Sequence, residues 1–258
     1  MAYQVKVSLR DIEPVIWRRL RIPGNITFQQ LHQIIQAAFG WLDYHLYNFK
    51  FERSKTVVAV PDDNYAPGDL YGEDITELDA RTTIIDELLG NNDSCVYEYD
   101  FGDSWEHEII IERQLKDTKK NSIPECLDGA RHRPPEDVGG AGGYEYFLNI
   151  IMDKKNPQRE EMLYWAEKDT RGRIFDPEYF NISEVNRRLL YALEDDEEHA
   201  RKLLTGKGLT GTVEWGWSDT CIKVKGKSYT MEHLGNLLLR LGGGSKVTIV
   251  VEPPRRRI

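Results

Sequence analysis

Long apolar runs are missing from this sequence of 258 residues, and cysteine is scarce. No apolar stretch approaches the roughly 20 residues that a membrane-spanning helix needs. The first residues, MAYQVKVSL, lack a charged segment followed by an apolar core, so no secretory signal is visible. The three cysteines, Cys95, Cys126 and Cys221, are odd in number and widely spaced, which argues against a disulfide framework. These absences predict a cytoplasmic protein that does not enter a membrane.

Familiar catalytic motifs are also missing. No GxSxG, HExxH or GxGxxG pattern occurs, and Gly206-Lys207-Gly208 lacks the spacing of a phosphate-binding loop. The composition is that of an ordinary globular protein, with 40% hydrophobic and 30% charged residues. The length allows one large domain or two smaller ones with a sizeable core.

Charge is distributed unevenly along the chain, although the net charge is only −9. Residues 41–112 carry 18 acidic and 4 basic side chains, whereas residues 201–258 carry 4 acidic and 11 basic ones. Such a composition shift indicates two units and two kinds of partner. We therefore predict a body at residues 1–193, a linker at 194–208 and a small basic unit at 209–258.

Alternating apolar residues predict strands at Tyr3–Leu9, Val15–Ile22 and Leu46–Phe51. Between the second and third, Thr27 and Gln30 form a capping box for a helix that Gly40 ends. The predicted body is therefore an α+β domain in which a mixed, mainly antiparallel sheet wraps helices, with a β-grasp-like start. Residues 212–217 and 220–225, a helix at 230–241 and a strand at 246–252 predict a ββαβ unit at the C-terminus.

The stretch Tyr97–Glu112, YEYDFGDSWEHEIIIE, predicts a β-hairpin broken at Gly102-Asp103-Ser104. A three-residue loop pairs residues whose numbers sum to 206. The apolar pairs are then Tyr99 with His107, Phe101 with Trp105 and Tyr97 with Ile109. The acidic pairs are Asp100 with Glu106 and Glu98 with Glu108, and such facing like charges require compensation.

Several blocks of the sequence resemble the Ri-plasmid open-reading-frame-three-like family over about residues 3–190. This family comprises proteins of mobile elements and of bacterial or archaeal genomes, some of them labelled as transposon-passenger, resolvase-like proteins. The resemblance implies an α+β domain of unassigned activity. Many members carry cysteines where this chain has Arg133 and Val138, so a thiolate site there is not expected. The matching blocks are Ile12–Arg19, Leu31–Gln36, Phe39–Trp41, His45–Phe49, Tyr97–Glu112, Pro134–Gly140 and Asp176–Glu178.

Carboxylates are dense on the hairpin and in the loop after Pro135. The side chains of Asp100, Asp103, Glu136 and Asp137 could hold Mg²⁺, Mn²⁺ or Ca²⁺ through oxygen ligands. The alternative is structural: aspartates cap turns, and an acidic face protects a sheet from aggregation.

The histidines add candidates for acid–base chemistry. His107 lies on the apolar side of the predicted hairpin, where a hydrogen-bonded core histidine is the simpler interpretation, although it is also a candidate acid or base beside Asp100 and Asp103. His32 and His45 could share a site with an aspartate, but the sequence does not show them adjacent.

Two sets of arginines are candidate binding residues. Arg18 and Arg19 on the second strand could meet phosphates or neutralise the acidic hairpin, and we favour neutralisation. Arg255, Arg256 and Arg257 make the C-terminal unit the best nucleic-acid candidate, with docking on an acidic protein surface as the alternative.

Three functions follow from these features. The first, which we favour over the two alternatives, is a non-enzymatic binding or accessory module of a mobile element, with an acidic body and with residues 199–258 contacting nucleic acid or an acidic protein surface. The second is a metal-dependent hydrolase or nuclease that uses the Asp100, Asp103, Glu136 and Asp137 carboxylates. The third is a protein–protein adaptor, for which an exposed apolar patch or a homo-oligomer is expected.

Overall fold

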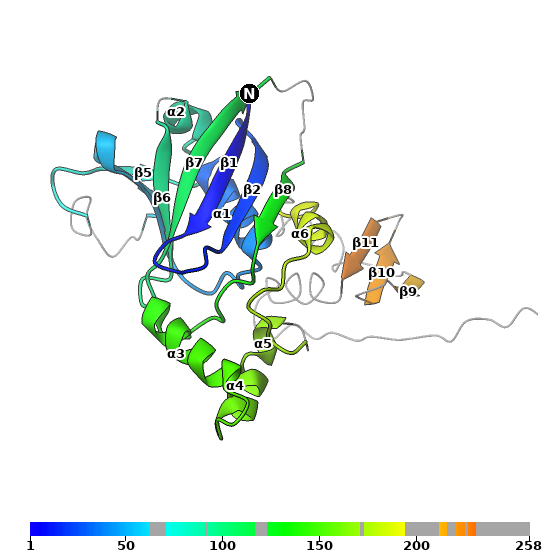
Figure 1. The fold of residues 1–258 in the computed structure, drawn as a ribbon. Helices are drawn as coiled ribbons and strands as arrows, with labels where there is room; N and C mark the ends of the chain where they lie inside the picture. The colour runs from blue at the N-terminus through cyan, green and yellow to red at the C-terminus, as the bar shows by residue number, and fades with distance from the viewer. Residues whose placement is uncertain are drawn as a thin grey trace, which may run out of the picture. The chain divides into compact units, whose positions relative to one another are not determined.

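The chain forms two compact units, Met1–Leu193 and Glu194–Ile258. The structure is a computed structural model, and Figure 1 shows its elements in chain order. It describes five stretches of the first unit and the backbone of three strands in the second: residues 1–61, 71–90, 92–116, 123–170 and 173–193, then 212–215, 220–224 and 227–230.

The first unit is built on an eight-stranded sheet with the strand order β5-β4-β3-β6-β7-β1-β2-β8. Neighbouring strands are antiparallel except β4 and β5, which run parallel. The predicted α+β fold with a mixed, mainly antiparallel sheet is therefore confirmed. The strands are β1 (Ala2–Leu9), β2 (Trp17–Pro23), β3 (Tyr47–Phe51), β4 (Thr56–Ala59), β5 (Thr76–Asp79), β6 (Ser94–Tyr99), β7 (Trp105–Leu115) and β8 (Glu125–Ala130).

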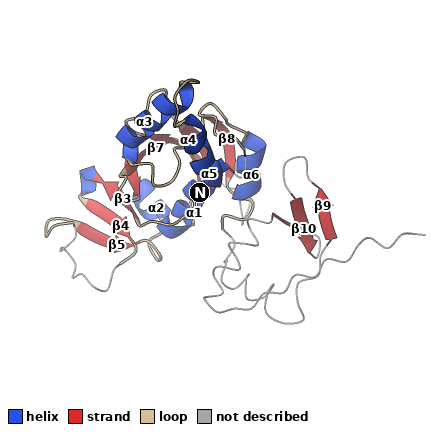
Figure 2. Ribbon diagram, turned by 90° about the horizontal axis from the view of Figure 1, so that it is seen from below, coloured by secondary structure: helices blue, strands red, loops and turns tan. Residues whose placement is uncertain are grey.

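Helices cover one face and one end of this sheet. Figure 2 shows the strands from β5 to β8 curving round α1, and Figure 1 shows α3, α4 and α5 beyond one end of the sheet. Because the inward residues of β1 and the apolar stripe of α1 belong to one buried cluster, the core lies between them. The helices are α1 (Phe28–Phe39), α2 (Ile85–Leu89), α3 (Gly140–Met152), α4 (Arg159–Trp165), α5 (Glu167–Thr170) and α6 (Ile182–Leu189), with a 3₁₀ turn, η1, at Glu52–Ser54.

The ends of α1 match the sequence prediction. The Thr27 hydroxyl accepts a hydrogen bond from the Gln30 N–H at 3.2 Å, and the Gln30 side chain accepts one from the Thr27 N–H at 2.9 Å. Gly40 ends the helix with a φ of 82°, in the left-handed region that glycine adopts without a steric penalty. This exit places the following loop at the end of the sheet where the hairpin turns.

The register of the β6–β7 hairpin differs from the prediction by two residues. Tyr97 pairs with His107, Tyr99 with Trp105, and Glu98 with Glu106, so paired numbers sum to 204. The connection spans five residues, because Asp100 and Ser104 leave the strands with φ of 59° and 53°. Since the shift is even, the inward set is unchanged, but Phe101 lies in the loop and is exposed instead of facing Trp105.

Other boundaries were also predicted imperfectly. β5 and β8 lie outside the strands that alternation predicts. Helix α2 starts after Ile84 without a side-chain cap, and helix α6 is capped by the Asn181 side chain. Between Arg159 and Thr170 the chain forms two consecutive helices, α4 and α5.

The second unit contains a three-stranded antiparallel sheet of order β11-β10-β9. Its strands are β9 (Thr212–Trp215), β10 (Thr220–Val224) and β11 (Lys227–Thr230), the last of which was not predicted. The linker at 194–208, most of the helix at 230–241 and the strand at 246–252 lie outside the described residues. Across the part of the chain that is described, no helix is long and apolar enough to cross a membrane.

Candidate metal centre

Three loops meet at the end of the sheet where α1 finishes. They are residues 40–46 after α1, the hairpin loop 100–104, and residues 134–139 before α3. The backbone N–H of Asp100 donates to the Leu46 carbonyl at 3.0 Å, and the backbone N–H of Leu42 donates to Oε1 of Glu136 at 2.7 Å. The first loop is therefore bonded to both of the others.

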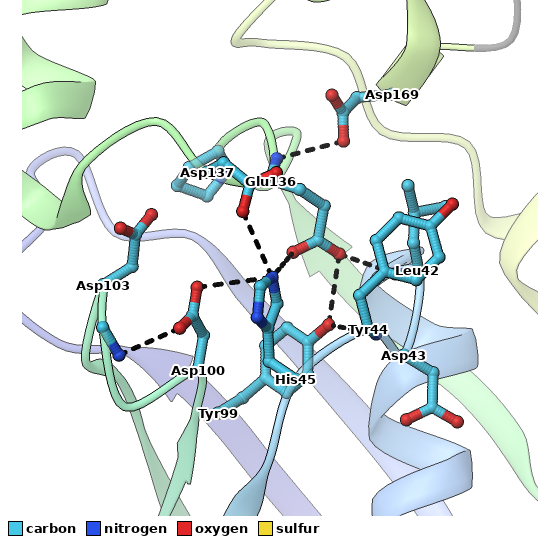
Figure 3. A network of polar contacts seen from close by, with 12 residues as sticks. Leu42, Asp43, Tyr44, His45, Tyr99, Asp100, Asp103, Glu136, Asp137 and Asp169 are labelled. Atoms are coloured by element: carbon cyan, nitrogen blue, oxygen red, sulfur yellow. Dashed lines mark hydrogen bonds and ion pairs between the residues drawn. The ribbon is translucent and has the colours of Figure 1, made fainter.

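His45 lies at the centre of this junction (Figure 3). Its Nε2 atom is 3.5 Å from Oδ2 of Asp100 and 3.3 Å from Oδ1 of Asp137. The donor atoms of these three residues all lie within 4.8 Å of one another. Oε2 of Glu136 lies 4.0 Å from the same Nε2 atom. One imidazole nitrogen from the first loop thus faces three carboxylates from the other two loops.

Glu136 is held in a fixed orientation and is 0% exposed. Its Oε1 accepts hydrogen bonds from the Leu42 N–H at 2.7 Å and from the Tyr99 hydroxyl at 3.4 Å. Its Oε2 is buried without a hydrogen-bond partner in the described structure, and so is Nε2 of His45. Burial raises the pKa of Glu136 above its ordinary value, against the opposing effect of the Arg133 charge. Buried polar atoms without partners are costly, so this pair calls for an explanation.

A buried ion pair between Arg133 and Asp169 contacts the backbone of Glu136. Oδ1 of Asp169 accepts a hydrogen bond from the Glu136 N–H at 3.1 Å and lies 2.7 Å from Nη1 of Arg133. The Arg133 guanidinium stacks 4.6 Å from the centre of the Trp41 ring and donates to the Gly40 carbonyl. The end of α1 and the 134–139 loop are thereby joined, which fixes the carboxylate geometry of the junction.

The backbone around the junction adopts left-handed conformations. Asp100 and Asp137 both have a φ of 59°, which aspartate tolerates better than most residues. Oδ1 of Asp100 accepts a hydrogen bond from the Gly102 N–H at 2.9 Å, leaving Oδ2 toward His45. Gly140, with a φ of 67°, has no room for a Cβ, since that atom would lie 2.8 Å from the Asp103 carbonyl oxygen. The hairpin tip therefore packs directly on the start of α3.

The structure brings together three of the four predicted carboxylates, those of Asp100, Glu136 and Asp137. Asp103 has a different role, because its Oδ2 accepts a hydrogen bond from the Gly139 N–H at 3.1 Å. His45 completes the group, and its place could not be read from the sequence because its neighbours come from distant segments. In the sequence, the only nearby cues are the flanking Tyr44 and Leu46 and the preceding Asp43.

His32, which was considered as a partner of His45, belongs to a separate buried network. Its Nε2 lies 2.8 Å from Oδ1 of Asp43, and its Nδ1 lies 2.8 Å from the Tyr97 hydroxyl. Its ring stacks on Tyr47 with centroids 3.6 Å apart. These contacts fix the Asp43 turn that leads into His45.

His107, the candidate acid or base, is a core residue. It is fully buried, its Nδ1–H donates to the Trp105 carbonyl at 2.9 Å, and its Nε2 accepts from the Trp41 indole at 3.2 Å. Burial lowers the pKa of His107 to about 4. It therefore lies away from the junction as a neutral, hydrogen-bonded side chain.

Basic side chains compensate the acidic face of the hairpin, as its facing carboxylates require. Lys50 contacts Glu98 at 2.6 Å, Arg10 contacts Glu106 at 3.1 Å, and Arg19 contacts Glu112 at 2.7 Å. Burial acts to raise the pKa of Glu98, but the hydrogen bond and charge of Lys50, together with hydrogen bonds from Ser104 and Asn48, lower it below the ordinary value. The neutralising role favoured for Arg19 agrees with this geometry.

Arg18 lies on the opposite face of β2 and is 3% exposed. Its guanidinium donates only to carbonyl oxygens, including that of Ala38 at the end of α1, and stacks between Phe39 and Phe180. Burial lowers the pKa of Arg18 to about 9. It therefore neither meets a hairpin carboxylate in the described structure nor presents its charge to solvent. Arg255, Arg256 and Arg257 lie outside the described residues.

The fold and the sequence together define an α+β protein of the plasmid pRiA4b ORF-3-like family. Residues 1–184 match this family, so the chain belongs to it. A curated relative is the uncharacterized protein y4hQ of Sinorhizobium fredii (strain NBRC 101917 / NGR234), which is 33% identical over 186 residues, 71% of this chain and 88% of the relative.

A solved relative has the same fold. It is the crystal structure of MM3350, a protein of unknown function from Methanosarcina mazei Go1, with a TM-score of 0.59 and 32% sequence identity. The match covers 71% of this chain and 96% of that one. The family of these proteins is thus established, and it is one of uncharacterised proteins with an α+β fold.

Proposed function

We propose that the protein binds one divalent transition-metal ion through His45, Asp100 and Asp137, and that the metal serves a hydrolytic reaction. The observation that carries this proposal is the buried pair at the junction. Nε2 of His45 and Oε2 of Glu136 face each other without hydrogen-bond partners in the described structure, which is the arrangement expected of ligands preorganised for a cation.

The separations of the donor atoms support a shared metal. Ligand atoms about 2.1 Å from one ion lie about 3.0 Å apart in an octahedral site and about 3.4 Å apart in a tetrahedral one. Nε2 of His45 is 3.3 Å from Asp137 and 3.5 Å from Asp100, close to these values. All three donor atoms lie within 4.8 Å of one another, so the two carboxylates would draw closer together around a shared ion. Glu136, at 4.0 Å from the same nitrogen, would need to approach by about 0.6 to 1 Å to become a fourth ligand.

The donor set favours particular metals. Carboxylate oxygens suit Mg²⁺, Ca²⁺ and Mn²⁺, whereas an imidazole nitrogen suits Zn²⁺ and Fe²⁺. A mixed set of one nitrogen and two or three oxygens therefore selects Mn²⁺ or Zn²⁺ over Mg²⁺ and Ca²⁺. Three protein ligands leave positions for water and substrate, and a bound metal lowers the pKa of that water and polarises a substrate carbonyl or phosphoryl group.

Isothermal titration of chelator-treated protein tests this proposal. We expect one Zn²⁺ or Mn²⁺ ion per chain with a Kd below about 10 μM, equivalent to about 7 kcal/mol, and weaker binding of Mg²⁺. His45→Ala and Asp137→Asn should each weaken binding at least tenfold, while Asp128→Asn, on the outer side of β8, should not. Binding that survives His45→Ala unchanged, or no binding at all, would overturn the proposal and leave His45 as a structural contact of the carboxylates.

A second proposal concerns residues 199–258, as a binding module for nucleic acid. Residues 201–258 carry a net charge of +7, whereas the preceding body is acidic. Clustered positive charge is what phosphate contacts require, and Trp215 and Trp217 supply aromatic surface for stacking. The membership of a plasmid-type family is compatible with this accessory role, and its salt dependence provides the test described in the Discussion.

A further inference from the structure

Three large apolar side chains in the loops that form the junction are exposed. Tyr44 and Leu46 are each 67% exposed and flank His45, while Phe101 is 45% exposed and follows Asp100. Apolar side chains gathered beside a polar site are characteristic of ligand contact. These side chains are next in sequence to two proposed metal ligands, and their exposure means that they are not needed to pack the core.

The contacts that hold the proposed ligands also hold this apolar surface. The Asp100 N–H donates to the Leu46 carbonyl at 3.0 Å, and the Tyr44 N–H donates to the Tyr99 hydroxyl at 3.0 Å. That hydroxyl is the group that also donates to Oε1 of Glu136. Figure 3 shows Tyr44 on the opposite side of His45 from Asp100. Phe101 directly follows Asp100 in the chain, so the two loops place one exposed aromatic residue on each side of His45 in the order of the chain.

The charge around the junction disfavours a phosphate-rich ligand. Residues 41–112, which supply two of the three loops, carry a net charge of −14. The basic groups of the surrounding contacts are already engaged, with Arg133 against Asp169 and Lys50 against Glu98. Because these two cations are paired, a polyanion at this part of the described structure would meet net repulsion, apart from its attraction to the metal itself.

We infer that the ligand of this site is an uncharged or cationic molecule whose polar group reaches the metal while an aromatic or branched aliphatic group packs on Tyr44, Leu46 and Phe101. This inference rests on the proposed metal function and names the class of molecule that the same site takes. It also separates the site from nuclease chemistry, since the apolar contacts and the acidic surroundings both select against a nucleic-acid backbone.

Two hydroxamic acids that differ by one ring test the inference on Co²⁺-loaded full-length protein. Both chelate a metal through the same atoms, so the change in visible absorption reports the binding of each. We expect benzohydroxamic acid to bind about tenfold more tightly than acetohydroxamic acid, since burying much of a phenyl ring contributes about 1.4 kcal/mol. Tyr44→Ser and Phe101→Ser should each reduce this ratio without changing Co²⁺ affinity, while Tyr164→Ser, at an exposed tyrosine of α4, should leave it unchanged.

The outcomes separate the two proposals. Equal affinity for the two acids on Co²⁺-loaded protein overturns the inference about the apolar surface and leaves the metal proposal intact. Tighter binding of adenosine monophosphate than of benzohydroxamic acid overturns the charge argument in the same way. Failure of Co²⁺, Zn²⁺ and Mn²⁺ to bind overturns the metal proposal and this inference together.

Discussion

Nε2 of His45 lies 4.0 Å from Oε2 of Glu136, and both atoms are buried without a hydrogen bond in the described structure. The other oxygen of Glu136 has two donors, so the carboxylate cannot rotate to satisfy Oε2 without losing them. A cation that enters between these two atoms would reduce the free-energy cost of leaving them without hydrogen bonds. The first prediction follows from this relationship.

A bound metal should stabilise the fold by mass action. At a free Zn²⁺ concentration about 100 times its Kd, the free energy of unfolding should rise by about 2.7 kcal/mol, and a chelator should reverse the gain. Calorimetric scans of wild type and of His45→Ala, each with and without Zn²⁺, measure this. The variant should show no gain, and an equal gain in both proteins would show that the metal binds elsewhere.

Gly140 should be required for the packing of the hairpin tip on α3. Gly140→Ala would put a Cβ 2.8 Å from the Asp103 carbonyl oxygen at a φ of 67°, so we expect a loss of about 1–3 kcal/mol in urea unfolding and weaker metal binding. Gly142 is a matched control in the same helix, since a Cβ there meets nothing within 4 Å. Gly142→Ala should be neutral or stabilising by up to about 1 kcal/mol. Equal effects of the two substitutions would contradict the close approach.

Lys50 should contribute more to stability than an exposed basic residue of the same sheet. Lys50→Met leaves the carboxylate of Glu98 nearly buried and without its cation, so we expect a loss of about 2 kcal/mol. Arg21→Met removes an exposed pair with Glu125 and should cost less than about 0.5 kcal/mol. Chemical denaturation measures both. A double variant, Lys50→Met with Glu98→Gln, should recover part of the loss, and no recovery would mean that Lys50 acts through packing alone.

His107 should make the protein sensitive to mild acid. Burial lowers its pKa to about 4 in the folded state, whereas an unfolded histidine titrates near 6.5. Between these values the unfolded chain binds a proton that the folded chain does not, so stability falls as pH falls. From pH 7 to pH 5 this histidine alone should cost about 2 kcal/mol.

The variant His107→Gln isolates that contribution, because glutamine does not titrate. Urea unfolding of both proteins at pH 7 and pH 5 should show a smaller acid loss for the variant, by about 2 kcal/mol. His132, whose pKa burial lowers to about 3, remains in both proteins and cancels in the comparison. An identical acid loss would mean that His107 is already protonated in the folded state.

The C-terminal arginines should bind nucleic acid through phosphates. Replacing Arg255, Arg256 and Arg257 together by alanine should weaken retention on a single-stranded oligonucleotide. It should also reduce the slope of log Kd against log salt by about 2, since each phosphate contact on a single strand contributes about 0.7. Fluorescence anisotropy at several salt concentrations measures the slope. An unchanged slope would mean that these arginines do not contact phosphates and that the positive charge of this unit serves another partner.

Local patterns were sufficient to predict the parts of the fold that depend on short-range interactions. The capping box of Thr27 and Gln30 is local, and it fixed the start of α1. The hairpin was found from its alternation, but its register was not, because Asp100 and Ser104 adopt left-handed conformations that nothing in the sequence demanded. β8 was missed because ECLDGA lacks alternation, and its pairing with β2 supplies the order instead.

The candidate site, like the fold, could be predicted only in part. The carboxylates of Asp100, Glu136 and Asp137 stood out by density, whereas His45 joined them only through tertiary contacts from a third loop. Asp103 satisfied the same pattern but binds the Gly139 N–H. Arg18 and Arg19 are adjacent in sequence yet point to opposite faces of β2, so one lies in the core and the other in an ion pair. Residue type indicated the chemistry, and only the fold could assign the partners.

The junction joins three segments that are far apart along the chain. An ion bound to His45, Asp100 and Asp137 would act as a cross-link, closing two long loops in the way a disulfide does in secreted proteins. Because these ligands come together only when the sheet and α3 are both formed, we expect the ion to slow unfolding more than it speeds folding. The unfolding rate of the protein would then depend on the concentration of the metal ion, and its lifetime in the cell would follow the availability of that ion.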